Sequence, residues 1–201
     1  MRIAVIGKGN VGSALAPNFA AAGHDVVYGV RDPSDPKYAS DDGVALRTVA
    51  EAVANAEAVL LAVHWDAVDA VFAEAGDLSG KILIDCTNAY DFQNNLRPLI
   101  PLDESAASII AKKTNAVVVK AFNQVGAAAM EAPKRSPKLL QFVASDDANA
   151  KAKVLKLAED AGFDARDAGP LEYARELEGM ARLWIAQAFQ GMPGETGWVL
   201  V

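Results

Sequence analysis

A short apolar segment that leads directly into a glycine-rich turn constrains the fold of this chain more than any other feature. Residues 1–6 have the composition of a buried strand, and Gly7, Gly9 and Gly12 follow in the spacing Gly-x-Gly-x-x-Gly. An amphipathic segment comes next, and a second apolar strand is predicted over residues 25–30. Glycines fall at this spacing by chance in many proteins, but the strand before them and the helix after them make the pattern specific. The sequence therefore predicts a strand–turn–helix–strand unit.

Each glycine has its own expected role in such a unit. Gly7 permits the tight turn, Gly9 lets the backbone approach a pyrophosphate, and Gly12 lets the helix pack closely on the strand. The helix N-terminus offers free N–H groups and a partial positive charge to the phosphates. The alternative is a tight turn that binds nothing. The predicted pyrophosphate-binding residues are Gly7, Lys8, Gly9, Asn10, Val11 and Gly12.

The residues after the second predicted strand indicate which dinucleotide is bound. NAD-binding proteins usually carry an Asp or Glu there, which accepts hydrogen bonds from the ribose 2′-OH. Here Arg31 follows the strand, and its planar guanidinium suits a 2′-phosphate, so NADP (as NADPH) is favoured over NAD. Asp32 argues the other way, because a nearby carboxylate repels phosphate. We interpret Asp32 as the cap of the turn over residues 33–36, and a solvated surface position remains the alternative for Arg31.

Composition limits the partners and the location of the protein. The 201 residues are 52% hydrophobic and carry a formal net charge of −7, which suffices for a well-buried domain and argues against nucleic acid or an anionic membrane as partner. The first predicted strand leaves no room for a signal peptide, and no apolar run approaches the ~20 residues of a membrane helix. No metal-ligand spacing occurs. We therefore expect a cytoplasmic protein without a membrane segment or a metal site.

Strands and helices alternate along the rest of the chain. Strands are predicted at residues 43–46, 58–63, 81–85, 116–121, 139–144 and 163–168. Helices are predicted at residues 48–55, 66–75, 105–113 and 147–161. This alternation is typical of an α/β, Rossmann-type doubly wound sheet that is mostly parallel, with later strands added antiparallel at one edge. We assign residues 1–168 to this domain and residues 169–201 to a small C-terminal helical appendage.

The helix predicted over residues 171–190 differs from the others. Tyr173, Leu177, Met180 and Trp184 form one stripe, and from Met180 onward the other faces also become apolar. A helix that is apolar on nearly all sides is buried or lies in a subunit interface. We predict a homodimer, with a plain core helix as the alternative.

Three loops leave the carboxyl ends of the central predicted strands, where open α/β sheets bind their ligands. The residues of interest in them are Ala62, Val63 and His64, then Asn88, then Ala121, Phe122 and Asn123. They could line a pocket for a nicotinamide and a second flat ring. His64 is the one candidate acid or base; the alternative is that it forms a wall with Trp65, with Asp66 as the N-cap of the next helix. Asp85 is expected to end its strand and to hydrogen-bond the following loop. Cys86 has no activating partner in the sequence and is expected to be a small buried residue.

Several short motifs occur together in a fixed order. They are Gly7-Lys8-Gly9-Asn10-Val11-Gly12, Gly29-Val30-Arg31-Asp32-Pro33, Asp85-Cys86-Thr87-Asn88, Lys120-Ala121-Phe122-Asn123 and Asp167-Ala168-Gly169-Pro170-Leu171. The set resembles the family of NADPH-dependent deazaflavin reductases, the coenzyme F420:NADP oxidoreductases, and their bacterial dinucleotide-binding relatives. The resemblance extends over essentially the whole chain, and the last motif is more specific than the glycine pattern.

The resemblance implies direct hydride transfer between C4 of the nicotinamide and a stacked small-molecule redox acceptor, which is a deazaflavin (coenzyme F420) or a flavin such as FMN or FAD. Such a transfer needs no nucleophile. The residues implied to line the cofactor beyond the glycine turn are Arg31, Ala62, Val63, His64, Asn88 and Ala121. Those implied to border the acceptor ring are Asn88, Phe122 and Asn123. The C-terminal helix and tail, residues 169–201, are expected to complete the acceptor pocket.

Two other functions remain open. One is a redox sensor that binds NADP(H) without turnover. The other is a small-substrate dehydrogenase or imine reductase, but those families usually append a long helical domain, and only a short segment follows Leu171 here. Within the resembling family, Arg31 and Asp32 stand where two basic residues are common, and Tyr90 lies where it can reshape the acceptor pocket.

Overall fold

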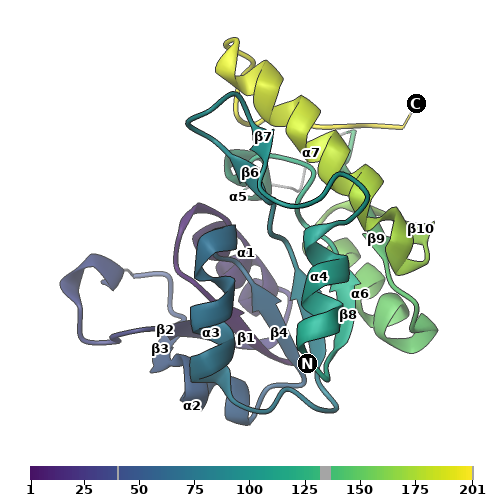
Figure 1. Ribbon diagram of the computed structural model, residues 1–201. Coiled ribbons are helices and arrows are strands. Elements are labelled where there is room, and N and C mark those ends of the chain that lie inside the picture. Colours follow the sequence, from purple (N-terminus) through teal and green to yellow (C-terminus); the bar gives the residue numbers. More distant parts are fainter. Residues whose placement is uncertain (40, 132–136, 201) are drawn as a thin grey trace.

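The computed structural model describes residues 1–39, 41–131 and 137–200. Within these residues, eight strands form one sheet in the order β10-β9-β8-β5-β4-β1-β2-β3 (Figure 1). The strands are β1 Arg2–Ile6, β2 Asp25–Val30, β3 Ala45–Thr48, β4 Ala58–Leu61, β5 Ile82–Asp85, β8 Val117–Lys120, β9 Leu140–Ala144 and β10 Asp164–Gly169. The six strands β8-β5-β4-β1-β2-β3 pair parallel with one another. Strand β9 joins β8 antiparallel, and β10 pairs parallel with β9. The predicted doubly wound sheet with an antiparallel addition is confirmed.

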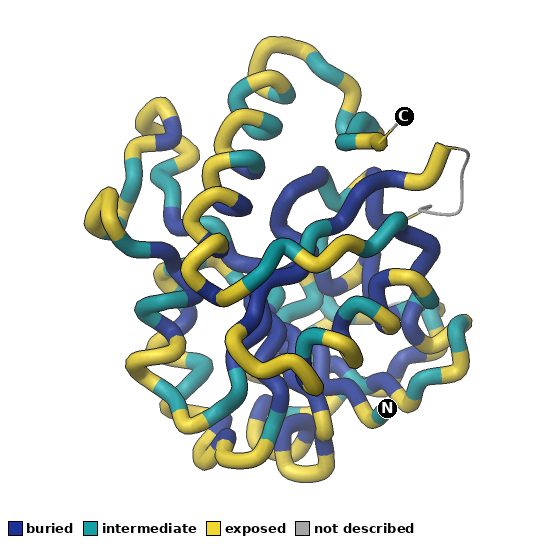
Figure 2. Tube along the Cα trace, turned by 90° about the vertical axis from the view of Figure 1, so that its right-hand side faces the viewer, coloured by how far each residue is buried: buried dark blue, intermediate teal, exposed yellow. Residues whose placement is uncertain are grey.

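Helices cover both faces of this sheet (Figure 1). They are α1 Asn10–Ala21, α2 Val49–Ala54, α3 Val68–Ala75, α4 Ala106–Lys113, α5 Ala127–Glu131, α6 Ala148–Asp160 and α7 Ala174–Phe189, with short 3-10 turns at Pro36–Tyr38, Trp65–Ala67 and Leu171–Tyr173. The buried residues of α1, α5 and α6 pack into one apolar cluster, and those of α2, α3, α4 and the start of α7 pack into a second. The central strands β1, β4, β5 and β8 are buried at nearly every position, whereas the edge strands β3 and β10 are not (Figure 2).

Local sequence signals account for where several elements begin. The Thr48 hydroxyl accepts a hydrogen bond from the Glu51 amide at 3.3 Å, and the Glu51 carboxylate accepts one from the Thr48 amide at 3.0 Å. This reciprocal capping box satisfies two N–H groups at the start of α2. The side chain of Asp147 accepts from the Ala150 amide at 2.8 Å and caps α6 in the same way.

The structure adds elements that the sequence did not indicate. A small hairpin, β6 Tyr90–Asp91 with β7 Arg97–Pro98, follows β5 and lies beside α7 at one end of the sheet (Figure 1). Helix α5 is also unpredicted. Both consist of very few residues, which is too short for a hydrophobic period to identify them.

The C-terminal helix has a different buried stripe from the one predicted. Its buried residues are Ala174, Leu177, Glu178 and Ala181, and Tyr173 is 45% exposed. The prediction for Tyr173 was wrong because the chain makes a 3-10 turn before α7 starts at Ala174, and this turn changes the helical phase. The expected division of the chain at residue 168 stays a prediction.

Candidate functional site

The three glycines of the first turn show three different kinds of space around them. Gly7 has φ +100°, and a Cβ there would lie 2.4 Å from the Ala62 carbonyl oxygen. A Cβ on Gly12 would lie 2.0 Å from the Gly7 carbonyl oxygen. A Cβ on Gly9 would meet nothing within 4 Å. Gly7 and Gly12 are therefore required for the turn and for close packing, whereas Gly9 keeps an open face at the start of α1, which its missing side chain leaves uncapped.

Lys8 lies between these glycines but is turned into the protein. Its Nζ lies 2.8 Å from Oδ2 of Asp42 and 4.2 Å from the centroid of the Tyr28 ring. The Tyr28 hydroxyl donates to the same Asp42 oxygen at 3.1 Å. Burial, and then the neighbouring Asp42 carboxylate, raise the pKa of Tyr28. The structure thus uses Lys8 to tie the segment after β2 to the glycine turn.

Arg31 is exposed just beyond β2, and within the described part of the chain it forms no ion pair. Asp32 accepts hydrogen bonds from the Ser34 amide at 2.9 Å and from the Ser34 hydroxyl at 2.6 Å. These bonds lower the pKa of the Asp32 carboxyl. The interpretation of Asp32 as the cap of its own turn is confirmed, and its carboxylate is engaged there rather than with Arg31.

A cleft of about 290 Å³ opens beyond the carboxyl ends of β1, β4, β5 and β8. Eight of the residues singled out from the sequence line it together: Gly9, Asn10, Val11, Ala62, Val63, His64, Asn88 and Asn123. Four loops separated along the chain therefore meet at this edge of the sheet, which is where open α/β folds bind ligands. We refer to it as the sheet-edge cleft.

The structure also brings two aromatic residues to the sheet-edge cleft that the sequence did not place there. Phe92 comes from the β6–β7 hairpin, and its ring stands edge-on to the exposed His64 ring, with centroids 6.2 Å apart. Trp184 comes from α7, and its Nε1 donates to the Thr196 carbonyl at 2.8 Å. A Cβ on Gly126 would lie 2.3 Å from Cη2 of Trp184, so the glycine is what lets the indole pack against this loop.

Other predicted residues do not reach the cleft. Ala121 and Phe122 are fully buried. Phe122 has φ 59°, and this left-handed conformation turns its ring into the core, where the centroids of Phe19 and Phe163 lie 5.7 and 6.0 Å away. The structure therefore does not place Phe122 beside an acceptor ring. Arg31 also lies outside the residues that line the cleft.

Two asparagines in the cleft hold each other in one orientation. The Asn123 side-chain nitrogen donates to Oδ1 of Asn88 at 3.1 Å and to the Leu177 carbonyl at 3.0 Å. The Asn88 side-chain nitrogen donates to the Asn123 carbonyl at 3.3 Å. Backbone carbonyls only accept, so they decide which end of each amide is nitrogen. Asn88 then retains one N–H and one oxygen lone pair that none of the described residues uses.

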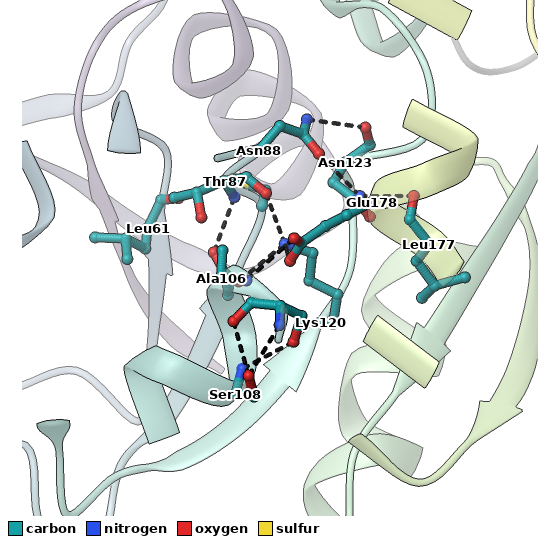
Figure 3. Close-up of polar contacts among 12 residues, drawn as sticks. Leu61, Thr87, Asn88, Ala106, Ser108, Lys120, Asn123, Leu177 and Glu178 are labelled. Atoms are coloured by element: carbon teal, nitrogen blue, oxygen red, sulfur yellow. Dashed lines mark hydrogen bonds and ion pairs between the residues drawn. The ribbon is translucent and has the colours of Figure 1, made fainter. Parts of the chain in front are cut away.

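A buried charged cluster lies next to this pair of asparagines (Figure 3). Nζ of Lys120 is 2.9 Å from Oδ2 of Asp85 and 2.8 Å from Oε1 of Glu178, and it donates to the Thr87 carbonyl at 2.6 Å. The Lys120 and Asp85 side chains are fully buried, and that of Glu178 is 4% exposed. Burial raises the pKa of the Glu178 carboxyl, and the two carboxylates raise that of Lys120 against the opposing effect of burial. Only the hydrogen bond from Asp85 to its own loop was expected, and it is present at the Thr87 amide, at 2.8 Å.

Two further expectations about reactive groups can be compared with the structure. Cys86 is buried and its Sγ donates to the Leu61 carbonyl at 3.0 Å; burial raises the pKa of its thiol, so it is not poised as a nucleophile. Asp66 does not cap a helix, because α3 begins at Val68 after the 3-10 turn.

Among the described residues, no group of three or more potential ligands could hold a metal ion. None of the described helices has the length and apolar character needed to cross a membrane.

A second, larger cleft of about 510 Å³ lies between α7 and the segment 89–104. Arg182 of α7 stands 5.7 Å from the centroid of the Tyr90 ring at this cleft, and Arg175 lies on the same helix face. Tyr90 was predicted to shape the acceptor pocket, but it lines this second cleft rather than the sheet-edge cleft.

Comparison with known proteins gives consistent matches. Residues 2–89 match the family described as "NADP oxidoreductase coenzyme F420-dependent". The F420-dependent NADP reductase of Methanothermobacter thermautotrophicus is 32% identical over 204 residues, covering 92% of this chain and 88% of the relative. A crystal structure described as that of "a putative f420 dependent nadp-reductase from arthrobacter sp. fb24" superimposes with a TM-score of 0.88 at 30% identity and covers 100% of this chain and 99% of that one.

A further relative is a longer protein. Metalloreductase STEAP3 of Rattus norvegicus is 30% identical over 177 residues, which cover 88% of this chain. They cover 36% of the metalloreductase, so the chain spans about a third of that protein's length.

Proposed function

The chain belongs to the family of coenzyme F420-dependent NADP oxidoreductases, and on this basis we propose that it transfers hydride between NADPH and a deazaflavin or flavin acceptor. The observation that carries the proposal is the sheet-edge cleft, in which the open face of the glycine turn and the Asn88–Asn123 pair lie together. The uncapped N-terminus of α1 is an anion site, and the paired amides lie where the four loops meet.

The residues of the glycine turn fit a pyrophosphate. The space beside Gly9 is open, and it adjoins the N-terminus of α1, where no side chain caps the first backbone N–H groups. Arg31 is available beyond β2 for a 2′-phosphate, because Asp32 is engaged by Ser34. The ion pair of Lys8 with Asp42 helps to fix the conformation of the turn.

The free groups of Asn88 suit a carboxamide. A primary amide ligand offers one N–H and one carbonyl oxygen side by side, which complement the N–H and lone pair that Asn88 leaves unused. Asn88 would therefore orient the nicotinamide through its carboxamide, with Asn123 fixing Asn88. Trp184, Phe92 and His64 would exclude water from the same space.

The bound nicotinamide supplies the hydride chemistry, and the chain's residues contribute binding, orientation and exclusion of water. Within the described residues the His64 imidazole has no hydrogen-bond partner, and we assign it to the wall of the cleft rather than to proton transfer. The similarity to the F420-dependent NADP reductase of Methanothermobacter thermautotrophicus favours coenzyme F420 as the acceptor. FMN and FAD are the other acceptors to be tested.

The test mixes the protein with NADPH and, in turn, with coenzyme F420, FMN and FAD, and follows the nicotinamide absorbance. We expect oxidation of NADPH with at least one of these acceptors. Tight NADPH binding without turnover of any acceptor would refute the proposal and identify a redox sensor instead. Oxidation by a small imine or carbonyl compound alone would identify a small-substrate reductase.

We also propose that the protein forms a homodimer through the end of the molecule that carries α7. Among the described residues, the large apolar side chains that are exposed lie on the segment 92–102, on residues 173–189 and on the tail 199–200. Exposed apolar surface concentrated in this way marks an interaction site. Leu183 is 52% exposed there; Leu183→Glu should convert a dimer into a monomer in light scattering, and a wild-type monomer would contradict the proposal.

A further inference from the structure

We propose that Asp85, Lys120 and Glu178 form a positioning unit that fixes the Asn88–Asn123 amide pair and makes its orientation depend on the docking of α7. The positioning of the amides follows from the contacts, whereas its effect on hydride transfer rests on the proposed function. We refer to the three residues as the buried triad (Figure 3).

The buried triad joins three elements that are far apart in the sequence. Asp85 ends β5 and Lys120 ends β8, and the two residues are direct partners in the parallel register. Their side chains therefore leave the same face of the sheet and meet at 2.9 Å. Glu178 comes from α7 and completes the cluster at 2.8 Å from Lys120.

One arm of the triad leads to Asn88. Lys120 donates to the Thr87 carbonyl at 2.6 Å, and Asp85 accepts from the Thr87 amide at 2.8 Å. Both polar groups of the Thr87 backbone are thus held by triad side chains. Asn88 is the next residue, so the position of its side chain in the cleft follows from this double contact.

The other arm leads through α7 to Asn123. Oε2 of Glu178 accepts from the Ala106 amide at 3.0 Å, at the N-terminus of α4, where a carboxylate is favoured by the helix dipole. Oε1 of the same side chain contacts Lys120. Leu177, the preceding residue, offers its carbonyl to the Asn123 side chain at 3.0 Å. The alignment of the Asn123 amide therefore depends in part on where α7 docks, and Glu178 fixes that docking next to Leu177.

Stability alone does not account for charged groups at this position. Three buried ionisable groups are costly to desolvate, and apolar residues of similar size often stabilise a fold as well or better. Ala174, Leu177 and Ala181 already bury an apolar stripe of α7. What the triad adds is hydrogen bonds of fixed direction to Thr87 and to the start of α4, and these set the geometry beside the cleft.

Glu178→Gln is the variant that separates the two arms with the least change in shape. One Gln oxygen can accept either from the Ala106 amide or from Lys120, and the NH₂ group then faces the other donor. We expect the rate of hydride transfer to fall about tenfold or more, because small displacements of an orienting group are costly. The NADPH dissociation constant, measured by fluorescence, should change by less than about threefold, because the glycine turn is untouched.

A second readout does not depend on activity. The side-chain amide ¹⁵N–¹H resonances of Asn88 and Asn123 report their hydrogen bonds directly. In the wild type the Asn123 NH₂ group, which donates to both Asn88 and the Leu177 carbonyl, should be protected from solvent exchange, and in Glu178→Gln this protection should be lost. Lys113→Met is the matched control. It removes an exposed ion pair, in which Nζ of Lys113 lies 2.6 Å from Oδ1 of Asp69, and should leave both readouts unchanged.

The outcomes separate this proposal from the proposed function. A wild-type protein that turns over no acceptor would refute the proposed function. The side-chain amide resonances would still decide whether the buried triad positions Asn88 and Asn123. Glu178→Gln with wild-type rate and wild-type protection would overturn the positioning role, as would a loss of NADPH affinity as large as the loss of rate. If Glu178→Gln does not fold, Asp85→Asn is measured in the same way, and failure of both to fold would show that the triad is purely structural.

Discussion

Gly9→Ala should weaken NADPH binding while leaving the fold intact. The Gly9 backbone has φ −86° and ψ −165°, which an alanine adopts without strain. The added Cβ meets no protein atom within 4 Å, so it projects into the space assigned to the pyrophosphate. The perturbation therefore acts on the ligand and not on the protein.

The expected magnitudes follow from these two facts. Alanine in place of glycine lowers the entropy of the unfolded chain, which stabilises by about 0.4–1 kcal/mol. Alanine is also a poorer N-cap than glycine by roughly 0.5 kcal/mol, so the free energy of unfolding should change by less than about 1 kcal/mol. Displacing the pyrophosphate by one methyl group loses at least one charge-assisted hydrogen bond, about 1.5–3 kcal/mol, or roughly ten- to hundredfold in affinity.

Urea unfolding and an NADPH fluorescence titration measure both quantities. Gly12→Ala is the contrasting variant, because its Cβ would lie 2.0 Å from the Gly7 carbonyl oxygen. It should lose about 1–3 kcal/mol of stability through overpacking as well as losing NADPH affinity. Unchanged NADPH affinity in a folded Gly9→Ala protein would refute the assignment of the pyrophosphate to this turn.

Two further variants test the charged groups. Arg31→Ala should weaken NADPH binding by about 1–3 kcal/mol and leave NADH binding unchanged, and an equal loss for both cofactors would exclude a role at the 2′-phosphate. Burial raises the pKa of Glu178 above the ordinary glutamate value, so its contribution to stability is complete below that value and is lost as pH rises through the raised pKa. Glu178→Gln should lack this pH dependence, although Asp85, Lys120, Tyr90 and Arg182 remain near position 178. The free energy of unfolding of both proteins is measured by urea unfolding from acidic to neutral pH. Parallel plots of this free energy against pH would contradict the prediction.

Much of the fold could be predicted because its signals are local. The glycine turn, the alternation of buried strands with helices and the Thr48–Glu51 capping box each depend on residues close together in the chain. The turn at Asp32 and the burial of Cys86 follow from the same kind of evidence. The resemblance to F420-dependent NADP oxidoreductases, which the comparisons confirm, also depends on short motifs in a fixed order.

The interior of the candidate site could not be predicted in the same way. Lys120 ends an apolar strand, and the sequence does not show that carboxylates of β5 and α7 meet it. The positive φ of Phe122 sends its ring into the core instead of the cleft, and Trp184 reaches the cleft only because Gly126 admits it.

The sequence by itself therefore determined the alternation that builds the sheet, the glycine turn and the loops that meet at the edge of the sheet. Hydrophobic period and turn chemistry act over a few residues, and such patterns can be read from the chain. Only the tertiary structure decided which side chains those loops present and what fixes them. Hydrogen bonds and ion pairs of the buried triad join residues that come together only after the strands and α7 have packed, and their geometry has no local pattern in the sequence.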